Sequence, residues 1–391
     1  MPALDGLRVL DLTQYEAGTS CTQHLAWLGA HIVKIEPPSG EPGRYVEPGD
    51  GNCLYFQSHN GNKIGMTLDL RSKEGHGIFL ELVKRFDMVV ENFTLGTMEG
   101  FGLGYDDLRV INPSIIYGTV KGFGRSGPYA TFKSFDGIAQ AAGGASSLTG
   151  PEAGPPMRPG AYYGDSGSGI TLALALVAAY LQRLRTGEGQ IVDVSMQEVV
   201  ATFMRTPLSY RARTGPVHPR TPIGKMYPCA PGGPNDYVTL TILTSGMWDS
   251  LCLALGRPEL TVDERFESQQ GRTENAEELD DIIRDWTGRR TKFEAMRELG
   301  AAGVPNSAVF DTSDLLSDEH LVSRGFVSEV RHPTEGSNKF LSPPFRLSAS
   351  TVAMKPSPLL SQHTSEVLRA ELGMSADKVS GLAERGVIRL P

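Results

Sequence analysis

The sequence lacks the features that would place the protein in several large functional classes. Its 391 residues contain no run rich in lysine and arginine, and the net charge is −8. A nucleic-acid partner is therefore not expected, because such a partner calls for a basic surface. The four cysteines, Cys21, Cys53, Cys229 and Cys252, form neither a CxxC pair nor a Cys/His metal spacing. We expect a reduced protein without a metal site.

Long apolar segments are also scarce. The most apolar stretch, Ile170–Leu181, covers about a dozen residues, whereas a membrane span needs roughly 20. The first residues, MPALDGLRVLDL, do not show the basic and then apolar pattern of a signal peptide. We therefore predict a cytoplasmic protein that does not contact a membrane, with Ile170–Leu181 inside a buried helix.

Short β-rich runs alternate with helical patterns over the first 120 residues. Hydrophobic residues make up 40% of the chain and charged residues 21%, as in ordinary globular proteins. The predicted strands are Leu7–Leu12, His31–Ile35, Lys63–Leu68, Met88–Glu91, Ser114–Lys121 and Gln190–Ser195. Alternation of this kind predicts a Rossmann-like α/β domain, in which crossover helices join the strands of a parallel sheet.

A second, smaller domain is expected in the later part of the chain. Thr214 to Asn235 is rich in proline and glycine and indicates a linker after a long helix at Gln197–Arg213. A mixture of strand and helix patterns follows. We predict a large domain over 1–219, an inserted α+β domain over 220–330, and a segment 331–391 that returns to pack on the large domain.

One acidic residue stands at a position suited to chemistry. Asp165 lies in a glycine-rich turn directly before the apolar helix. Helix N-termini stabilise negative charge, and Gly164, Gly167 and Gly169 would leave room for a bulky ligand. A carboxylate presented in this way can attack a thioester carbonyl. The alternative is that Asp165 only caps the helix, a common role for aspartate.

Two further segments follow predicted strands, where α/β proteins bind ligands. Asn92 and Phe93 come directly after Met88–Glu91, and an ordinary β–α turn is the alternative there. The stretch from Lys121 to Asp136 combines glycines with Lys121, Arg125 and Lys133. Such a loop suits a phosphate or carboxylate, although a solvated surface loop has a similar composition.

The ordered series of these segments resembles the class III CoA-transferases, the family of formyl-CoA transferase and carnitine CoA-transferase. The resemblance spans nearly the whole chain. It is carried by LDGLRVLDLTQYEAG, LGAHIVKIEPPSG, VENFTLG, YGTVKGFG, SFDGIAQAAGG, the GD pair at Gly164 and Asp165, RTGEGQIVDVSMQE, GVPNSAVF and PPFRLS. Each piece alone is weak, but the ordered set is specific.

The resemblance implies a covalent mechanism with Asp165 as the catalytic nucleophile. Asp165 would attack an acyl-CoA to give a mixed anhydride and then an aspartyl-CoA thioester, from which an acceptor acid takes the CoA. No metal, ATP or permanently bound cofactor is implied, because the CoA thioester is itself a substrate. The family also implies an interlocked homodimer. CoA contacts would come from Tyr15, Glu16, Leu68, Arg71, Asn92, Phe93, Thr97, Lys133 and Phe135, with Met196 near the acyl group.

Several positions depart from the family pattern. Glu16 stands where formyl-CoA transferase has a neutral glutamine, and Thr94, Gly100 and Pro37 stand where cations are common. Phosphate binding would then weaken or shift to Arg71, Lys63 or Arg125. The glycine-rich insertion of formyl-CoA transferase is also missing between Thr214 and Asn235, so formate and oxalate are not the expected substrates.

Two alternatives to an ordinary transferase stay open. An α-methylacyl-CoA racemase has the same fold, but the racemases carry a catalytic histidine at the position of Phe135, and no histidine lies between His76 and His218. A weakly active partner subunit of a heteromeric transferase would explain the missing cations. The retained Asp165 argues against that hypothesis.

The substrates are predicted from charge alone. Cations follow one another in and after the long helix, namely Arg205, Arg211, Arg213, His218, Arg220 and Lys225. If two of them point into the site, they could hold the far carboxylate of a dicarboxylic acid. Succinyl-CoA is therefore the predicted donor and a dicarboxylate the predicted acceptor, while a solvated basic helix face is the alternative.

Overall fold

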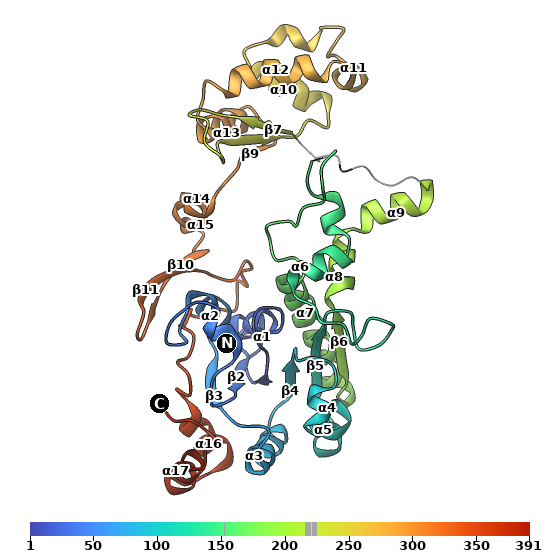
Figure 1. Ribbon diagram of the computed structural model, residues 1–391. Coiled ribbons are helices and arrows are strands. Elements are labelled where there is room, and N and C mark those ends of the chain that lie inside the picture. Colours follow the sequence, from blue (N-terminus) through green and yellow to red (C-terminus); the bar gives the residue numbers. More distant parts are fainter. Residues whose placement is uncertain (152, 216–219, 221–224) are drawn as a thin grey trace. The chain divides into compact units, whose positions relative to one another are not determined.

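The computed structural model describes residues 1–151, 153–215, 220 and 225–391. The chain divides into a large unit, Met1–Arg220 with Gly325–Pro391, and a small unit, Thr221–Arg324 (Figure 1). The sequence places the boundaries after residues 219 and 330. The second boundary differs because Val327–His332 (β10) pairs with Gly336–Leu341 (β11) in an antiparallel hairpin that belongs to the large unit.

A six-stranded parallel sheet forms the centre of the large unit, which confirms the predicted α/β class. The strands lie in the order β3-β2-β1-β4-β5-β6. Their bounds are β1 Arg8–Asp11, β2 His31–Glu36, β3 Ile64–Thr67, β4 Met88–Glu91, β5 Ile116–Lys121 and β6 Ile191–Ser195. The strand order reverses between β1 and β4, and ligands of open α/β sheets bind outside the carboxyl ends of the strands at such a point.

Each strand of this sheet ends in a buried polar residue. The six residues are Asp11, Glu36, Thr67, Glu91, Lys121 and Ser195. The strand interiors are apolar by contrast, with Val9, Val33 and Val89 fully buried. Because a buried charge must be paired to be tolerated, this edge of the sheet has to carry a network of ion pairs. Polarity is thus concentrated at the edge where the topology predicts a site.

Helices cover both faces of the sheet. Side chains that alternate along a strand enter different cores, as Leu10 and Val9 do. The helices of the large unit are α1 Ala17–Trp27, α2 Leu54–Asn60, α3 Lys73–Val83, α4 Thr97–Gly100, α5 Tyr105–Ile111, α6 Asp136–Ala142, α7 Asp165–Thr186, α8 Met196–Phe203, α9 Arg205–Thr214, α16 Thr364–Leu372 and α17 Ala376–Glu384. The core on one face includes residues of α3, α5, α16 and α17, and the other core includes residues of α1 and α7.

Helix α7 is longer than the sequence predicts, since it begins at Asp165 rather than at Ile170. By length and composition it could cross a membrane, but Leu172, Ala173 and Leu176 on one face are buried in the core of the large unit. It is therefore a core helix. The long helix predicted at Gln197–Arg213 is instead two helices, α8 and α9, with a break at Met204.

The crossing of α1 and α7 depends on Gly169. A Cβ atom there would lie 2.5 Å from Ser20 Cβ and 2.8 Å from the carbonyl oxygen of Ala17. We expect Gly169→Ala to lower the free energy of unfolding by about 1–3 kcal/mol, because the backbone of α1 would have to move. The helical Gly77 has open space at the same distance, so Gly77→Ala should raise the stability by about 0.5–1 kcal/mol. Chemical denaturation of both variants measures the difference, and equal stabilities would contradict it.

The small unit has a three-stranded antiparallel sheet in the order β7-β8-β9. Its strands are β7 Lys225–Pro228, β8 Tyr237–Leu240 and β9 Asn306–Ala308, and its helices are α10 Ser245–Ala254, α11 Gln269–Glu274, α12 Ala276–Thr287, α13 Lys292–Ala301, α14 Thr312–Ser317 and α15 Glu319–Ser323. The core is built on Trp248, Phe266 and Trp286. Strand β7 lies within the segment that the sequence analysis assigns to a linker.

Candidate active site

Two adjoining pockets lie along the carboxyl edge of the large sheet. The Asp165 pocket has a volume of about 270 Å³, and the Arg71 pocket about 220 Å³. Gln14 and Phe93 line both pockets. Of the positions singled out in the sequence, Tyr15, Glu16, Asn92, Phe93, Thr97, Lys133, Phe135, Met196 and Asp165 line the first, and Leu68 and Arg71 line the second. The fold thus brings together residues from 15 to 196 at one edge.

The loop Thr13–Tyr15, which follows β1, forms one wall of the Asp165 pocket. Side chains from other elements bind its backbone. Asn92 accepts a hydrogen bond from the N–H of Gln14 and donates one to its carbonyl oxygen, both at 2.8 Å. The carbonyl of Tyr15 accepts from Thr19, and the N–H of Thr13 donates to Asp11 at 2.9 Å. Both polar groups of the Asn92 side chain therefore act on the loop.

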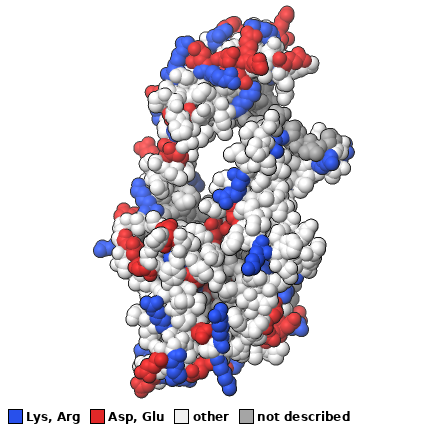
Figure 2. All heavy atoms as spheres, in the orientation of Figure 1, with Lys and Arg blue, Asp and Glu red and all other residues white. Residues whose placement is uncertain are grey.

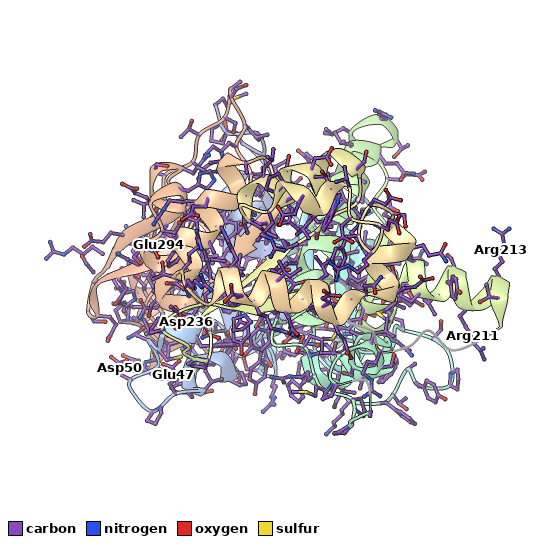
Figure 3. The ribbon with its side chains drawn as sticks, turned by 90° about the horizontal axis from the view of Figure 1, so that it is seen from above. Glu47, Asp50, Arg211, Arg213, Asp236 and Glu294 are labelled. Carbon is purple, nitrogen blue, oxygen red and sulfur yellow. The ribbon has the colours of Figure 1, made fainter. Side chains whose placement is uncertain are left out.

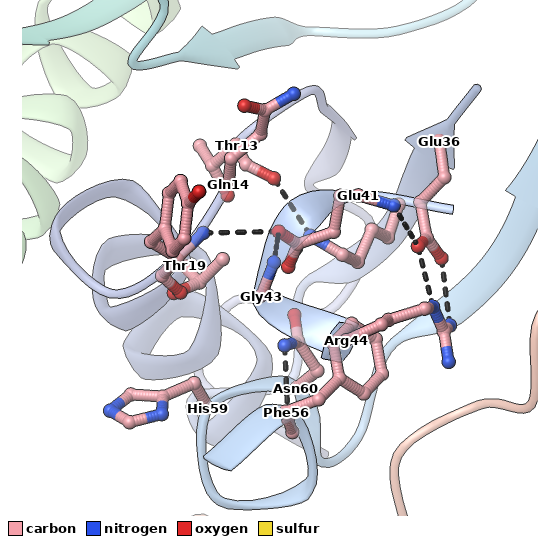
Figure 4. A network of polar contacts seen from close by, with 12 residues as sticks. Thr13, Gln14, Thr19, Glu36, Glu41, Gly43, Arg44, Phe56, His59 and Asn60 are labelled. Carbon is pink, nitrogen blue, oxygen red and sulfur yellow. Dashed lines mark hydrogen bonds and ion pairs between the residues drawn. The ribbon is translucent and has the colours of Figure 1, made fainter. Parts of the chain in front are cut away.

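A buried pair of charges completes this hold on the loop (Figure 4). Lys34 Nζ donates to the carbonyl of Thr13 at 2.8 Å, and Glu41 accepts from the N–H of Tyr15 at 3.2 Å. Lys34 and Glu41 lie 3.6 Å apart and are almost fully buried. With these contacts, the three N–H groups and the three carbonyl oxygens of Thr13–Tyr15 are all bound by side chains. Tyr15 is held at a φ of 55°, a conformation that costs energy for a non-glycine residue.

We expect Asn92→Ala to loosen this loop. The variant leaves the N–H and the carbonyl of Gln14 without their partners, which should cost about 1–3 kcal/mol of stability. Because Gln14 lines both pockets, the KM for acyl-CoA should rise as well. Thermal unfolding and steady-state kinetics measure the two effects. Asn235→Ala is a suitable control, since Asn235 is exposed in a turn of the small unit. An Asn92 variant with unchanged KM and stability would contradict this role.

Asp165 is the first residue of α7, and the side chain of Asp136 holds its backbone in place. Asp136 Oδ1 accepts hydrogen bonds from the N–H of Gly164 at 2.9 Å and of Asp165 at 3.4 Å. The N-cap residue is Gly164, and the side chain of Asp165 makes no capping hydrogen bond. The capping interpretation of Asp165 is therefore not supported. Its carboxylate lines the pocket, and within the described ranges no group donates a hydrogen bond to it.

The glycines around Asp165 serve packing rather than ligand access, which corrects the interpretation of the sequence. A Cβ at Gly164 would lie 2.9 Å from Ala139 Cβ in α6, and one at Gly167 would lie 3.0 Å from the ring of Phe203 in α8. The third, Gly169, contacts α1 as described above. Three helices thus approach the first turn of α7 closely, and this fixes the direction in which Asp165 points.

The surroundings of Asp165 are acidic. Burial, the largest cause, and the negative charges of Glu16 and Asp136 together raise the pKa of Asp165 to about 7, while His59 acts in the opposite direction. A carboxylic acid with this pKa is only partly ionised near neutral pH. The site therefore holds a carboxylate of unusually high basicity, as a nucleophile in a partly desolvated pocket should be.

Glu16 lies against the first turn of α7. Its Oε1 accepts a hydrogen bond from Ser166 Oγ at 2.6 Å, and its Oε2 is 3.7 Å from His59 Nε2. The imidazole of His59 is held by the carbonyl of Tyr55 through Nδ1 at 2.9 Å. His59 does not line the pocket. His59 could not be found from the sequence, because helix α2 was not predicted and nothing in its spacing relates it to Asp165.

The cations of the site differ in their availability. Lys63, named from the sequence as a phosphate ligand, is buried and occupied by Asp11 at 3.0 Å and Asn60 at 2.9 Å. That prediction is wrong for Lys63. Lys121 is paired with Glu91 at 2.8 Å, and Arg125 lies 3.3 Å from Glu99. Two other cations, Arg71 and Lys133, are exposed beside the pockets.

The basic residues expected to bind a second carboxylate line neither pocket of the large unit. Arg211 and Arg213 extend outward from the end of α9 (Figure 3), and Arg205 is exposed as well. Arg220 donates to the carbonyl oxygens of Ser147 and Pro151, both at 3.1 Å. Lys225 belongs to the small unit and is paired with Asp280 at 2.6 Å. His218 lies outside the described residues.

The charges on the surface agree with the expectation that the protein does not bind nucleic acid. On the face drawn in Figure 2, acidic and basic side chains are intermixed, with uncharged surface between them. In the small unit many of them form pairs, such as Arg265 with Glu278 and Arg289 with Asp285. Pairs of this kind neutralise each other locally, so this face does not present the basic surface of a nucleic-acid-binding protein.

The comparison with known proteins now identifies the family. Residues 4–364 match the description of CoA-transferase family III. The chain belongs to CoA-transferase family III. The formyl-CoA:oxalate CoA-transferase of Streptomyces coelicolor is 38% identical over 408 aligned positions, which cover 99% of both chains. The enzyme of the same name from Rhodopseudomonas palustris is 35% identical over 418 positions, covering 100% of this chain and 98% of the relative.

Solved structures give the same result. A CAIB/BAIF family protein from Brucella suis superposes with a TM-score of 0.84 at 30% identity, covering 94% of this chain and 99% of the other. Rv3272 from Mycobacterium tuberculosis gives a TM-score of 0.82 at 29% identity, covering 94% and 99%. The predicted membership of the class III CoA-transferases is confirmed. The protein is a class III CoA-transferase, a family whose substrates are CoA thioesters.

Proposed function

We propose that this class III CoA-transferase moves CoA from an acyl-CoA to a free carboxylic acid, with Asp165 as the nucleophile. The observation that carries the proposal is the state of Asp165. Its carboxylate faces a pocket, receives no hydrogen bond from the described residues, and has a pKa raised to about 7. These properties suit a group that must form and break an acyl bond, and they do not suit a helix cap.

The transfer needs four steps, each of which exchanges one acyl bond for another. A carboxylate oxygen of Asp165 attacks the thioester carbonyl, and CoA thiolate leaves as the mixed anhydride forms. The thiolate attacks the aspartyl carbonyl, which frees the donor acid and gives an aspartyl-CoA thioester. The acceptor carboxylate attacks that thioester to give a second anhydride and thiolate, and the thiolate then takes the new acyl group and restores the Asp165 carboxylate. No external energy source is required.

Negative charge that develops on the attacked carbonyl oxygen lies near the N-terminal end of α7. The N–H groups of Gly164 and Asp165 are bound to Asp136, and that of Ser166 donates to the carbonyl of Tyr162 at 3.0 Å. These groups are therefore not free to donate to the substrate. The dipole of the 22-residue helix α7 remains as a source of positive potential.

For CoA itself we propose a path along the two pockets. The thioester would lie beside Asp165, and the phosphates would be bound by Arg71 and Lys133, whose charged groups are exposed at the pockets. Leu68, Phe93, Thr97 and Phe135 would contact the remaining parts of the molecule. Asn92 would act indirectly, by holding Gln14, and Tyr15 and Glu16 would contact the pantetheine end.

Mass spectrometry of the covalent intermediate tests this function. Incubation with an acyl-CoA but without an acceptor should load CoA onto the peptide that contains Asp165, and hydroxylamine should convert the adduct to a hydroxamate. Acetyl-CoA, propionyl-CoA and succinyl-CoA serve as donors. Failure of all donors to label Asp165, in an enzyme that still transfers CoA, would disprove the mechanism.

The prediction of succinyl-CoA and a dicarboxylate has lost its physical basis. It depended on cations that line neither pocket of the large unit, as described above. The relatives are named formyl-CoA:oxalate CoA-transferases, but Glu16 adds a negative charge beside Asp165. We propose donors and acceptors with a single carboxyl group. A panel of mono- and dicarboxylic acids measures the preference, and faster transfer to succinate than to propionate would contradict it.

The assembly is proposed to be an interlocked homodimer, as the family resemblance implies. Helix α7 supports an extensive protein contact, because the apolar residues Ile170, Leu174, Leu181 and Leu184 are exposed on one side of it, at 50–72% of their surface. Their spacings of four, seven and three residues place them on one helix face. Sedimentation analysis distinguishes a homodimer from a monomer and from a heteromer that needs a related subunit. We also propose a cytoplasmic location, which agrees with the four cysteines being free thiols.

The racemase remains a second candidate function because of one observation, the proximity of His59 to Glu16. However, a racemase needs two groups in contact with the α-carbon, and His59 does not line the Asp165 pocket. Phe135, at the position of the racemase histidine, is 60% exposed and packs its ring against Tyr15. Exchange of the α-proton of an acyl-CoA in deuterated water would support the racemase. We expect none.

A further inference from the structure

Helix α7 begins without a capping side chain of its own. Its N-cap residue is Gly164, whereas serine, threonine, aspartate or asparagine usually fills this position and accepts a hydrogen bond from the first turn. The acceptor comes from α6 instead. Asp136 Oδ1 accepts from the N–H of Gly164 at 2.9 Å and from that of Asp165 at 3.4 Å. Because α6 supplies the acceptor, the carboxylate of Asp165 is free of a capping role.

Gln140 fixes the direction of the Asp136 carboxylate. Its Nε2 donates to Asp136 Oδ2 at 2.6 Å and to the carbonyl oxygen of Ala161 at 2.8 Å. Both neighbours are acceptors, so the amide of Gln140 cannot be turned around without losing both bonds. Since Oδ2 is held by Gln140, Oδ1 is the oxygen that meets the N–H of Gly164. Helix α6 therefore binds the backbone both at Ala161 and at the start of α7.

The backbone at Gly164 also packs directly on α6. A Cβ atom there would lie 2.9 Å from Ala139 Cβ and 3.2 Å from Asp136 Oδ1. Asp136, Ala139 and Gln140 are separated by three and four residues, so they share one face of α6. All three are buried, and Gln140 is 0% exposed. One helix face thus holds the turn that presents Asp165, by contact as well as by hydrogen bonds.

The carboxylate of Asp136 is costly for the fold. Asp136 is 5% exposed, and within the described ranges it forms no ion pair and is bound by three N–H groups alone. A buried charge without a counter-ion lowers stability, whereas a neutral amide could accept from Gly164 at less cost. The negative charge also helps to raise the pKa of Asp165. Local rules are typically broken in this way at functional sites.

We propose that Gln140 and Asp136 are positioning residues for the nucleophile: Gln140 orients the carboxylate of Asp136, and this carboxylate holds the backbone of Asp165 so that its side chain faces the pocket. The proposal rests on the proposed transferase function, since it assigns a task in the same reaction. Neither Gln140 nor Asp136 lines the Asp165 pocket or the Arg71 pocket. Their effect should therefore fall on the rate of attack and not on the binding of CoA.

Gln140→Met tests the pair, because methionine keeps the length of the side chain and removes both hydrogen bonds. In a single turnover, addition of CoA to Asp165 should slow by about 10–100-fold, since a small misplacement of a reacting group costs about 10²-fold. The affinity for free CoA, measured by calorimetry, should stay within about twofold. Gln182→Met is the matched control, because Gln182 binds Gln190 at an exposed position of α7, and it should leave both values unchanged.

Asp136→Asn separates direction from charge. The amide keeps an acceptor for Gly164, but its NH2 group meets the NH2 group of Gln140, so the single-turnover rate should fall here as well. Loss of the negative charge should also move the rising limb of the pH profile to lower pH, because a cause of the raised pKa of Asp165 is removed. Gln140→Met keeps that charge and should leave the limb in place.

The other groups that interact electrostatically with Asp165 stay the same in both variants. They are Glu16 before α1, and Tyr55 and His59 in α2. Glu188→Gln, at an exposed position after the end of α7, is the control for the loss of a carboxylate. It should change neither the rate nor the position of the limb.

The outcomes separate the two proposals. A wild-type rate in folded Gln140→Met would overturn the positioning role, and so would equal losses of rate and of CoA affinity, because these would mean that the pair only supports the fold. If Gln140→Met does not fold, Asp136→Asn decides, since a wild-type rate there would overturn the role. If no acyl-CoA labels Asp165 in the wild-type enzyme, the transferase mechanism itself fails.

Discussion

Replacing Asp165 by alanine should lower the rate of CoA transfer by about 10⁴-fold or more, because the variant has no group that can form the aspartyl anhydride. Glu16 cannot substitute for it, since Glu16 is held by Ser166 at 2.6 Å and follows an immobilised loop. The variant should still bind acyl-CoA, because Arg71, Lys133 and the pocket walls are unchanged. Stopped assays of product acyl-CoA measure the rate, and calorimetry with acyl-CoA measures binding.

Two companion variants make the result specific. Asp165→Asn keeps the volume of the side chain and should be as inactive as Asp165→Ala, whereas a purely structural role would let the amide restore most of the activity. Asp193→Asn removes an exposed carboxylate whose Oδ2 accepts from the backbone of Arg125 at 3.1 Å, away from Asp165. It should retain nearly full activity. A loss of less than tenfold in Asp165→Ala would disprove nucleophilic catalysis by this residue.

The sheet and its edge could be predicted from the sequence because their signals are local. A strand such as Met88–Glu91 shows as a short apolar run that ends in a charged residue. A parallel sheet follows from the alternation of such strands with helices. Since the carboxyl ends of parallel strands share one edge, Asn92 and the loop that begins at Lys121 could be placed there without knowing any contact. Asp165 was singled out by its glycine-rich turn before an apolar helix, and the family resemblance supplied its role and the remaining positions, including Tyr15.

The contacts that tune the site could not be predicted in this way. Lys34 and Glu41 act on the loop Thr13–Tyr15 through buried hydrogen bonds between residues 21 and 26 positions apart. His59 lies on a short helix without a clear period. The glycines near Asp165 were misinterpreted because spacing alone does not tell whether a missing side chain makes room for a ligand or for another helix. Likewise, a cation counts as available only when its partners are known, and Lys63 has three.

The pH dependence of the reaction should reveal the acidic surroundings of Asp165. Only ionised Asp165 can attack, so kcat/KM for the acyl-CoA should rise with pH through about 7, the pKa of this group. Glu16→Gln removes a negative charge that raises this pKa. The rising limb should therefore move to lower pH, by roughly one unit, the shift that a neighbouring charge typically produces. At pH 6 the variant should then be faster than the wild-type enzyme in forming the CoA adduct.

His59→Gln provides the opposite shift, which makes the argument independent of any general loss of activity. When protonated, His59 lowers the pKa of Asp165, so removal of the imidazole should move the limb to higher pH. Profiles between pH 5 and 9 for the wild-type enzyme, both variants and the control Glu188→Gln measure the three positions. Limbs that move in the same direction would mean that loop disorder, and not charge, alters the site. Limbs that do not move would mean that another group controls the ionisation, and that Glu16 and His59 do not act on the charge of Asp165.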